Sequence, residues 1–234
     1  MPSSAAKSRS KAQPLRSPGA RSLDAKGARA AGDRKPRAER WEEVLEAATQ
    51  VFYEKGYDAA SLQEIADRVG ILKGSIYYYI KTKEDLRDHL LLEVHHKGLA
   101  MIQQLASSKG SALHRLEQMI RGHIDFVCRN LAQTTVYLHE LKRIGPERRA
   151  ALFPGHAYRD VFMAVIKQAQ AEGLLLERLD PKLTAQVMLG TLNSPSVWYR
   201  PSRPRQSAAV ADIFVLMVLR GLASDKGLRV LKPR

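Results

Sequence analysis

Apolar positions recur every three to four residues along most of the chain, and segments that alternate apolar and polar residues are nearly absent. This spacing is typical of helices that bury one face, so the sequence predicts an all-α protein. Capping residues, glycines and prolines separate the periodic segments and indicate where each helix begins and ends. The predicted helices span residues 41–56, 62–69, 73–80, 83–106, 112–130, 133–144, 155–172, 181–199 and 206–223.

The most informative local pattern lies in residues 61–86. Ser61 and Glu64 form a predicted capping box at the start of a short helix, and Gly70 supplies the left-handed turn that ends it. A second short helix then begins near Lys73. Two short helices joined by such a turn are typical of a DNA-binding helix-turn-helix.

The second of these helices has a surface suited to a polyanion, because it carries lysine and hydroxyl side chains and no acidic residue before Glu84. Such side chains contact phosphate oxygens, and those at the helix N-terminus reach base edges in the major groove. The three consecutive tyrosines at 77–79 spread around the helix, so at least one faces outward. The alternative is a tyrosine-rich helix that only packs.

Residues 40–86 resemble the DNA-binding domain of the tetracycline-repressor (TetR) family. The resemblance rests on Gly-hydrophobic-x-Lys-Gly-Ser-hydrophobic-Tyr-x-Tyr at 70–79, followed by Lys-x-Lys-Glu-x-Leu at 81–86. It extends to the first helix, whose apolar stripe ends at the predicted C-cap Gly56. The fourth helix is predicted to begin at a second capping box, formed by Thr82 and Asp85.

The resemblance also implies which residues contact DNA. Those that would approach bases or the nearby backbone are Gln63, Lys73, Gly74, Ser75 and Tyr78, and those that would hold phosphates are Tyr77, Tyr79 and Lys83. Two positions depart from the family pattern, since Leu72 replaces a small polar residue and Ile80 replaces an aromatic one. Leu72 either contacts a thymine methyl group or packs against the first helix.

The charge balance also favours an anionic partner, since the 234 residues carry a formal net charge of +14. Eleven lysines and arginines precede Trp41, against three acidic residues. Residues 1–37 contain few large apolar side chains and are predicted to be a disordered basic extension. This extension is either an arm that adds affinity for DNA, or a solvated linker or misassigned start.

The remaining chain divides into a DNA-binding domain at 38–86, a ligand-binding and dimerisation domain at 87–225 and a flexible tail at 226–234. There is no apolar run of signal-peptide or membrane-spanning length, which predicts a cytoplasmic, nucleoid-associated protein with no membrane partner. Cys128 is the only cysteine and lies in an apolar stretch, so we expect no internal disulfide and an inert, buried thiol.

The last two predicted helices are apolar on more than one side. A second copy of the chain would cover the surplus face, which predicts a homodimer through residues 182–223. The TetR resemblance implies the same dimer, which would read a palindromic operator with two recognition helices about one DNA turn apart. The alternative is a monomer in which these helices form the interior.

Residues 189–201 resemble the corresponding helix of TetR-type regulators of fatty-acid and sterol breakdown, in which an asparagine precedes a Trp-Tyr-Arg-Pro ending. That resemblance implies an acyl-CoA effector, whose anionic CoA would suit Arg200, Arg203 and Arg205. Alternatively, Trp198 and Tyr199 only close the dimer interface. The predicted ligand-binding residues are His123, Phe126, Val127, Tyr137, Leu141, Phe162, Met163, Ile166, Trp198 and Arg200.

Other function classes have little support in the sequence. Phosphate-binding glycine loops, the Gly-x-Ser-x-Gly elbow and the His-Glu-x-x-His pair are all absent, so we expect no enzyme and no cofactor. His89, Glu93 and His96 share a helix face, but their spacing matches no known metal site. A DNA-packaging protein would not need the long second domain. The sequence therefore predicts a ligand-responsive transcriptional regulator, most simply a repressor whose fourth helix moves when the effector binds.

Overall fold

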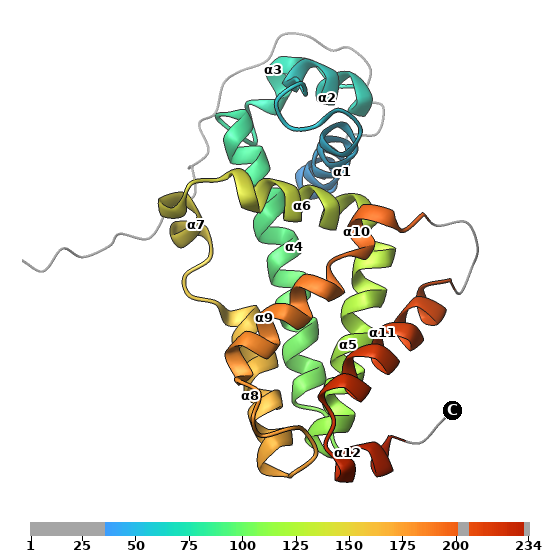
Figure 1. Cartoon of the computed structure of the whole chain (residues 1–234). Helices are drawn as coiled ribbons and strands as arrows, with labels where there is room; N and C mark the ends of the chain where they lie inside the picture. The colour runs from blue at the N-terminus through green and yellow to red at the C-terminus, as the bar shows by residue number, and fades with distance from the viewer. Residues whose placement is uncertain (1–35, 201–205, 232–234) are drawn as a thin grey trace, which may run out of the picture. The chain divides into compact units, whose positions relative to one another are not determined.

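The computed structural model describes residues 36–200 and 206–231. Within these residues it contains twelve helices and no strand, apart from one isolated backbone bridge between Leu175 and Ala223. The predicted all-α class is confirmed (Figure 1). Most of the predicted basic extension, and also Arg203 and Arg205, lie outside the described residues.

Three helices form the N-terminal domain, which the sequence predicts to be the DNA-binding domain: α1 (Arg37–Lys55), α2 (Leu62–Val69) and α3 (Lys73–Ile76). They bury a common apolar core, to which the start of the next helix also contributes. Its fully buried members are Val44, Ala48, Val51, Ile65, Ala66, Ile76 and Leu86. α1 is the longest of the three, and its apolar stripe supplies one wall of this core.

The boundaries of α2 follow its sequence signals. The Ser61 hydroxyl accepts a hydrogen bond from the Glu64 backbone N–H at 3.1 Å, and Gly70 adopts a left-handed conformation with φ 71°. The second half of the predicted capping box does not form, because the Glu64 carboxylate pairs with Lys55 of α1 instead. This ion pair joins α1 to α2, and the Glu64 carboxylate is then not used to cap α2.

α3 is shorter than predicted, since its regular part ends at Ile76 and a tight turn follows. In that turn the Tyr79 backbone N–H donates to the Ile76 carbonyl at 2.9 Å. Such bonds between residues three apart are typical of a closing helical turn, and here they redirect the chain toward the Thr82 cap of the next helix.

The second domain is built around α4 (Lys83–Ala106), which begins in the DNA-binding domain and continues into the centre of the second one (Figure 1). Two further helices pack directly against α4, namely α5 (Ala112–Arg129) and α8 (Ala157–Ala171). Outside them, α9 (Pro181–Leu192) packs against α8, and α11 (Gln206–Leu222) packs against α5. Their largest fully buried side chains are Ile102, Leu113, Leu116, Met119, Ile120, Ile124, Phe162 and Ile166.

α6 (Leu131–Arg143) packs against both α1 and α4 and so links the two domains. A short helix that the sequence did not indicate, α7 (Pro146–Leu152), follows it. Pro146 occupies its first position, where a missing N–H costs nothing. The sequence prediction overlooked this helix because one short turn shows no apolar period.

The predicted helix over 181–199 is wrong as one element. It breaks after Leu192, and α10 (Pro195–Trp198) starts separately, because Pro195 has no N–H with which to continue the α9 ladder. The predicted C-terminal tail also differs, since residues 225–230 form helix α12 (Asp225–Val230), capped by the Ser224 hydroxyl. A Cβ on Gly227 would meet the Leu174 carbonyl oxygen, so only glycine fits at this contact.

Cys128 is buried, as expected, and burial raises the pKa of its thiol to about 11, with a smaller contribution from the charge of Asp125. In the described ranges, no helix combines the length and the apolar character needed to cross a bilayer.

Candidate nucleic-acid interface and ligand cavity

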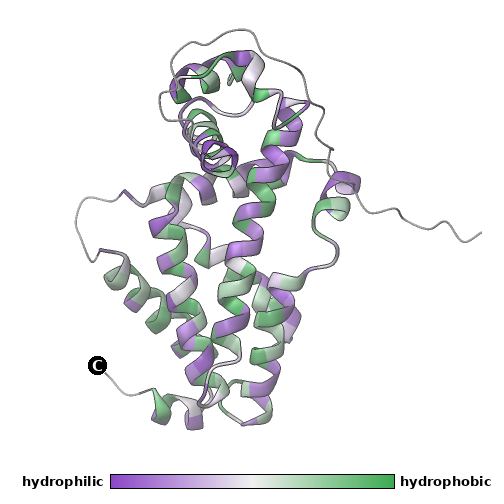
Figure 2. Ribbon diagram, turned by 180° about the vertical axis from the view of Figure 1, so that it is seen from behind, coloured by the Kyte–Doolittle hydropathy of each residue, from purple (hydrophilic) through white to green (hydrophobic). Residues whose placement is uncertain are grey.

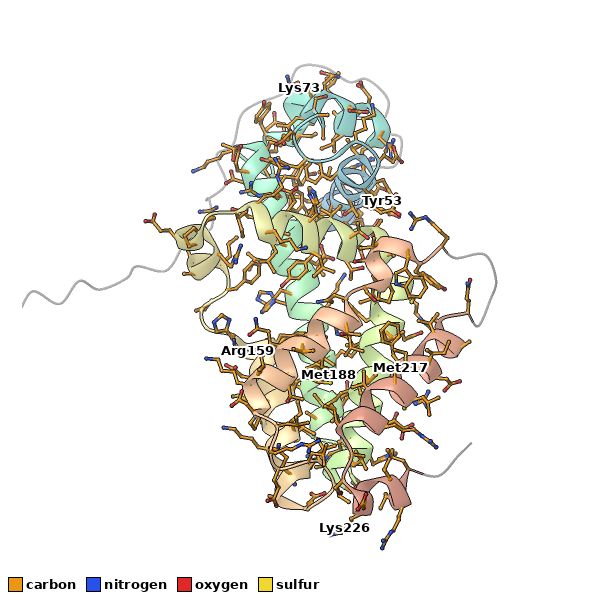
Figure 3. The ribbon with its side chains drawn as sticks, in the orientation of Figure 1. Tyr53, Lys73, Arg159, Met188, Met217 and Lys226 are labelled. Atoms are coloured by element: carbon orange, nitrogen blue, oxygen red, sulfur yellow. The ribbon has the colours of Figure 1, made fainter. Side chains whose placement is uncertain are left out.

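The outer surface of α3 carries most of the residues predicted to contact DNA. Lys73, Gly74, Tyr77 and Tyr78 are exposed, and Lys73 lies at the tip of the domain (Figure 3). Ser75 is half-buried at the same turn. The helix is held from below by the buried Ile76 and Ile80. α3 therefore presents a basic and aromatic surface to solvent.

Leu72 precedes this helix and is 81% exposed. The structure therefore excludes packing against α1, which was one of the two expectations for this side chain. An apolar group at the edge of a basic surface remains available to a thymine methyl group. Gln63, also predicted to contact DNA, is exposed on α2, where its amide donates to the Asp67 carboxylate at 2.7 Å.

Tyr79 differs from its two neighbours because it packs inward. Its ring stacks on Trp41 of α1 at a centroid distance of 5.6 Å. The Arg37 guanidinium lies 5.5 Å from the same ring and donates to the Tyr78 carbonyl at 2.9 Å. Arg37 thereby supports the turn after α3, a role that sequence reasoning missed because the two segments are distant along the chain.

Lys83, predicted to hold a phosphate, makes contacts within the protein instead. Its ammonium group donates to the Ala60 carbonyl at 2.6 Å and to the Asp58 carbonyl at 3.2 Å. It also lies 4.4 Å from the centroid of the Tyr57 ring. These contacts fasten the start of α4 to the loop between α1 and α2, so a phosphate contact would compete with them.

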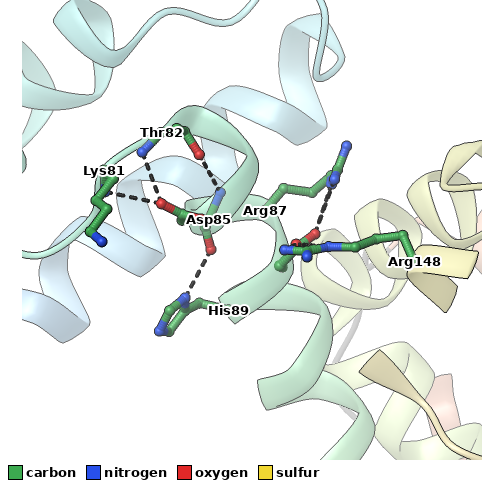
Figure 4. Close-up of polar contacts among 7 residues, drawn as sticks. Lys81, Thr82, Asp85, Arg87, His89 and Arg148 are labelled. Atoms are coloured by element: carbon green, nitrogen blue, oxygen red, sulfur yellow. Dashed lines mark hydrogen bonds and ion pairs between the residues drawn. The ribbon is translucent and has the colours of Figure 1, made fainter. Parts of the chain in front are cut away.

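The start of α4 is fixed by the predicted capping box, which is complete (Figure 4). The Asp85 carboxylate accepts from the Thr82 and Lys81 backbone N–H groups at 3.0 and 3.1 Å, and the Thr82 hydroxyl accepts from Asp85 in return. Burial alone would raise the pKa of Asp85, but these donors outweigh burial and lower the pKa. His89 bonds the Asp85 backbone carbonyl at 2.8 Å, one turn further on.

Ion pairs connect α7 to α4, and the end of α6 to the loop between α1 and α2. Asp88 of α4 is 3% exposed, and its carboxylate accepts from Arg87 at 3.0 Å and from the Arg148 Nε of α7 at 2.7 Å (Figure 4). Arg143, at the end of α6, pairs with Asp58 in the loop before α2. Because Asp88 is buried, its arginine partners are required to offset desolvation.

The second domain contains a mostly apolar cavity of about 160 Å³, which we call the inner cavity. Five of the predicted ligand-binding residues line it, namely His123, Phe126, Val127, Tyr137 and Leu141. The other lining residues are Val94, His95, Gly98, Thr134, Leu138, Tyr158, Leu189 and Asn193. They come from α4, α5, α6 and α8 and from the end of α9.

The remaining predicted ligand residues do not line the inner cavity. Phe162 and Ile166 are buried in the core of the second domain, and Met163 packs against that core. Phe162 lies directly behind the cavity wall, because its ring contacts those of His123 and Tyr158. Trp198 is exposed on α10, and the Arg200 guanidinium donates to the Tyr199 carbonyl at 2.8 Å. Phe162, Met163 and Ile166 were predicted from apolar spacing, which does not separate a cavity wall from packed interior, whereas Trp198 and Arg200 came from the family resemblance of residues 189–201.

A larger recess of about 430 Å³, the outer pocket, adjoins the inner cavity. The two share His95, Tyr137, Leu141, Tyr158 and Leu189. The outer pocket is also lined by α7 and by the basic side chains of Arg149, His156 and Arg159 (Figure 3 labels Arg159). An apolar chamber therefore adjoins a recess that carries two arginines, of which Arg159 is paired with Asp160.

A chain of hydrogen bonds crosses the wall of the inner cavity. His123 of α5 is buried, its Nδ1 lies 2.8 Å from the Tyr158 hydroxyl of α8, and its Nε2 lies 3.1 Å from Asn193 Oδ1. Burial lowers the pKa of His123 to about 4, despite the opposing contacts from Asn193 and the Leu192 backbone. The imidazole is therefore neutral at physiological pH. Gly98 makes room for this group, because a Cβ there would lie 3.3 Å from the Tyr158 ring.

An apolar surface on the second domain faces solvent. It consists of the exposed side chains of α9 and α11, which we call the α9–α11 patch: Leu183, Val187, Ile213, Leu216 and Met217. Figure 2 shows apolar colour along most of α11, and Met217 of this helix, labelled in Figure 3, is exposed. An exposed patch of this kind marks an interaction surface.

These features define a class of protein. A helix-turn-helix with an exposed basic and aromatic surface is joined by one continuous helix to a helical domain that contains an apolar cavity. This is the architecture of a DNA-binding regulator that carries its own ligand-binding domain.

Comparison with family models identifies the family. Residues 44–90 match the model described as bacterial regulatory proteins, tetR family, and residues 109–222 match the tetracyclin repressor-like C-terminal domain. Together these matches cover more than half of the chain, and the chain belongs to the TetR family of transcriptional regulators. Its predicted assignment as a regulator rather than an enzyme is confirmed.

Individual relatives agree with this assignment. The chain is similar to the HTH-type transcriptional repressor KstR2 of Mycobacterium tuberculosis, with 28% identity over 185 residues, which cover 78% of this chain and 92% of the relative. The structure of KstR2, a ketosteroid transcriptional regulator, matches with a TM-score of 0.69 and 26% identity, covering 82% of this chain and 98% of that one.

Two further relatives have names that bear on ligand chemistry. The fatty acid metabolism regulator protein of Bacillus subtilis is 22% identical over 190 residues, covering 80% of this chain and 98% of the relative. The structure of AibR in complex with isovaleryl coenzyme A and operator DNA matches with a TM-score of 0.68 and 25% identity, covering 76% of this chain and 97% of that one.

Proposed function

We propose that this protein is a repressor that binds a palindromic operator as a homodimer and leaves it when a hydrophobic effector, an acyl-CoA thioester, occupies the second domain. The inner cavity is the observation that carries this proposal, because α4 forms part of its wall and also begins in the DNA-binding domain. The names of KstR2 and of the AibR complex with isovaleryl coenzyme A support a repressor and a thioester, respectively.

In this proposal the DNA contacts come from the exposed surface of α3 and the start of α2. Lys73, Gly74, Ser75, Tyr78 and Gln63 approach the bases or adjacent backbone, and Tyr77 contacts phosphate. Leu72 adds an apolar contact at the edge of the same surface. We assign Tyr79 and Lys83 a positioning role, since their groups are used to hold the turn and the start of α4.

The dimer forms when the α9–α11 patch of one subunit packs against the same patch of another. Two helices from each subunit then make a four-helix interface with two-fold symmetry. Burial of this patch removes apolar area from water, and the two recognition helices face successive major grooves.

We place the effector differently from the expectation based on Trp198 and Arg200. The acyl group enters the inner cavity, and the anionic part of CoA lies in the outer pocket beside Arg149, His156 and Arg159. Arginine is well suited to phosphate because its guanidinium donates two parallel hydrogen bonds.

Release of DNA follows from the position of α4 and α7. An effector that widens the cavity displaces α4 directly, and one that fills the outer pocket displaces α7, which is tied to α4 through Asp88 and Arg148. The ligand must bind the wide-spaced state more tightly, and about 1.4 kcal/mol of this difference gives each tenfold loss of operator affinity.

The decisive experiment is a titration of the protein into a labelled duplex from its own upstream region, at physiological salt, with and without short- and medium-chain acyl-CoA thioesters. We expect binding that a scrambled duplex does not compete for and that one thioester abolishes. Specific binding that no thioester disturbs would contradict the effector assignment. Weak binding without sequence preference would contradict the repressor assignment and favour an architectural role.

A further inference from the structure

The hydrogen-bonding direction of the groups in the inner cavity specifies a feature of the ligand beyond its apolar character. Because it concerns the occupant of the same cavity, this inference rests on the proposed function. Its basis is the chain Asn193–His123–Tyr158, which joins the end of α9 to α5 and to the first turn of α8.

The partners of His123 determine which of its nitrogens carries the proton. A neutral imidazole has one N–H donor and one acceptor nitrogen. Nε2 lies 3.1 Å from the amide oxygen of Asn193. That oxygen can only accept, so the proton resides on Nε2 and Nδ1 carries the lone pair.

This assignment fixes the direction of the next hydrogen bond. Nδ1 can only accept, so the Tyr158 hydroxyl, 2.8 Å away, donates its single proton to His123. The phenol oxygen has no second proton, and it lines the inner cavity only with lone pairs. Tyr158 therefore acts toward a ligand as a hydrogen-bond acceptor.

We propose that the effector carries a hydrogen-bond donor, a hydroxyl group, on its apolar part and that Tyr158 accepts this hydrogen bond in the inner cavity. The ligand class is then a hydroxylated acyl or alicyclic compound rather than its saturated or ketone counterpart. A ketone oxygen placed at Tyr158 would face another acceptor. Both oxygen atoms would then be buried without a hydrogen-bond donor, which is unfavourable.

The other polar groups of the cavity do not oppose this selection. The Thr134 hydroxyl donates its single proton to the Asn130 carbonyl at 2.8 Å, so it too can only accept from a ligand. Asn193 also lines the cavity, and its amide oxygen is the partner of His123. Tyr137 and His95 pair at 3.1 Å where the inner cavity meets the outer pocket, and within the described residues no further acceptor fixes the direction of that bond. The His95–Tyr137 pair can therefore donate to a ligand carbonyl or accept from a ligand hydroxyl, whereas Tyr158 can only accept.

The test uses small probes that enter the inner cavity without CoA. A cavity of about 150 Å³ holds a six-membered carbon ring, and this one measures about 160 Å³. Cyclohexanol and cyclohexanone have nearly the same size, but only the alcohol can donate a hydrogen bond. The ratio of their dissociation constants, measured by protein-observed NMR, therefore reports whether the site accepts or donates. We expect cyclohexanol to bind about tenfold more tightly, the effect of one buried hydrogen bond.

Two further measurements distinguish this mechanism from nonspecific hydrophobic binding. ¹⁵N NMR of the imidazoles should show His123 protonated on Nε2. In the His123→Leu variant the Tyr158 hydroxyl loses its acceptor and becomes free either to donate or to accept, so the preference for cyclohexanol should disappear. Tyr199→Phe is the matched control, because it removes a buried phenol from the core without changing the cavity lining, and it should keep the wild-type preference.

The outcomes distinguish the inference from the proposed function. If His123 carries its proton on Nδ1, or if cyclohexanone binds as well as cyclohexanol or neither binds, the inference is wrong. Thioesters that still release the operator in those cases leave the proposed function intact. If no thioester releases the operator, the proposed function fails separately, whatever the probes show.

Discussion

Arg148 of α7 donates two hydrogen bonds to the carboxylate of Asp88, a buried residue of α4, and so ties the wall of the outer pocket to the helix that begins in the DNA-binding domain. Arg87 binds the other oxygen of the same carboxylate, which means that Asp88 keeps a partner if Arg148 is removed. The contact with α7 can therefore be removed without leaving the buried Asp88 carboxylate unpaired.

We predict that Arg148→Ala impairs the response to effector more than it impairs DNA binding. The effector concentration needed for half-release should rise about fivefold, the size of a change of ~1 kcal/mol in coupling. Operator affinity without effector should change less than twofold. Arg129→Ala, which removes an exposed ion pair within α5, is the control. Equal release curves for wild type and Arg148→Ala would show that α7 takes no part.

Lys83 is predicted to act through the fold rather than through phosphate. Lys83→Ala removes the hydrogen bonds to Ala60 and Asp58, and we expect it to lower the free energy of unfolding by about 1–2 kcal/mol. The salt dependence of DNA binding should stay unchanged, because the ammonium group faces carbonyl oxygens.

The comparison is Lys73→Ala, which removes an exposed charge at the tip of α3. That variant should keep its stability, lose about one unit from the slope of log affinity against log salt, and alter base preference. Unfolding by urea and binding at several salt concentrations measure both quantities. A reduced slope for Lys83→Ala with unchanged stability would restore the phosphate contact.

Leu72 is predicted to affect DNA recognition and not stability. Its side chain is almost fully exposed, so Leu72→Ser should change the free energy of unfolding by less than about 0.5 kcal/mol. If Leu72 contacts a thymine methyl group, replacing that thymine by uracil in the operator weakens the wild type and leaves Leu72→Ser unaffected. A thymine-to-uracil scan across the operator measures this, and equal sensitivity of both proteins at every position would exclude the contact.

The sequence predicted the parts of this structure that local chemistry determines. The caps at Ser61 and Thr82 form at the expected positions, because a short oxygen-bearing side chain satisfies backbone N–H groups within three residues of itself. The helix-turn-helix and the second domain follow from such signals together with the apolar period, and the family resemblance could be stated from residues 61–86 alone.

The features that the sequence did not predict depend on contacts distant along the chain. Lys83 has two carbonyl groups from another loop as partners, and Tyr158 lies against His123 only after α8 has packed on α5. Phe162 and Val127 have the same apolar spacing as cavity residues in general, yet only Val127 lines the cavity. Which apolar positions border empty space is decided by tertiary packing, for which one sequence holds no local signal.

The proposed dimer predicts that a charge in the α9–α11 patch separates the subunits. Met217 is 66% exposed in the single chain, and Met217→Lys would place an ammonium group in the centre of the interface. We expect sedimentation at micromolar concentration to show a monomer, and operator affinity to fall about 10²-fold because the two half-sites are no longer bound together.

The control for this variant is Leu228→Lys, since Leu228 is an exposed apolar residue on α12, outside the patch. It should leave both the sedimentation and the DNA binding unchanged. If Met217→Lys remains a dimer, α9 and α11 do not form the interface.

His123 gives a prediction for the dependence of stability on pH. Its pKa is lowered from 6.5 to about 4, chiefly by burial. Between these two pH values His123 is therefore protonated in the unfolded chain but neutral in the folded protein. The contribution of neutral His123 is thus present above pH 6.5 and is lost progressively as the pH falls toward 4. The full difference corresponds to about 3 kcal/mol, at about 1.4 kcal/mol for each pKa unit.

The measurement is urea unfolding of the wild type and of His123→Gln between pH 7.5 and 4.5. Glutamine keeps a polar group at this position but does not titrate, so the wild type should lose more stability over this range, and the gap between the two curves should close or reverse as the pH falls. Parallel curves would mean that water reaches the imidazole in the folded state. In that case the inner cavity would already be hydrated around His123, and an entering ligand would have to displace that water before it could meet the Tyr158 oxygen.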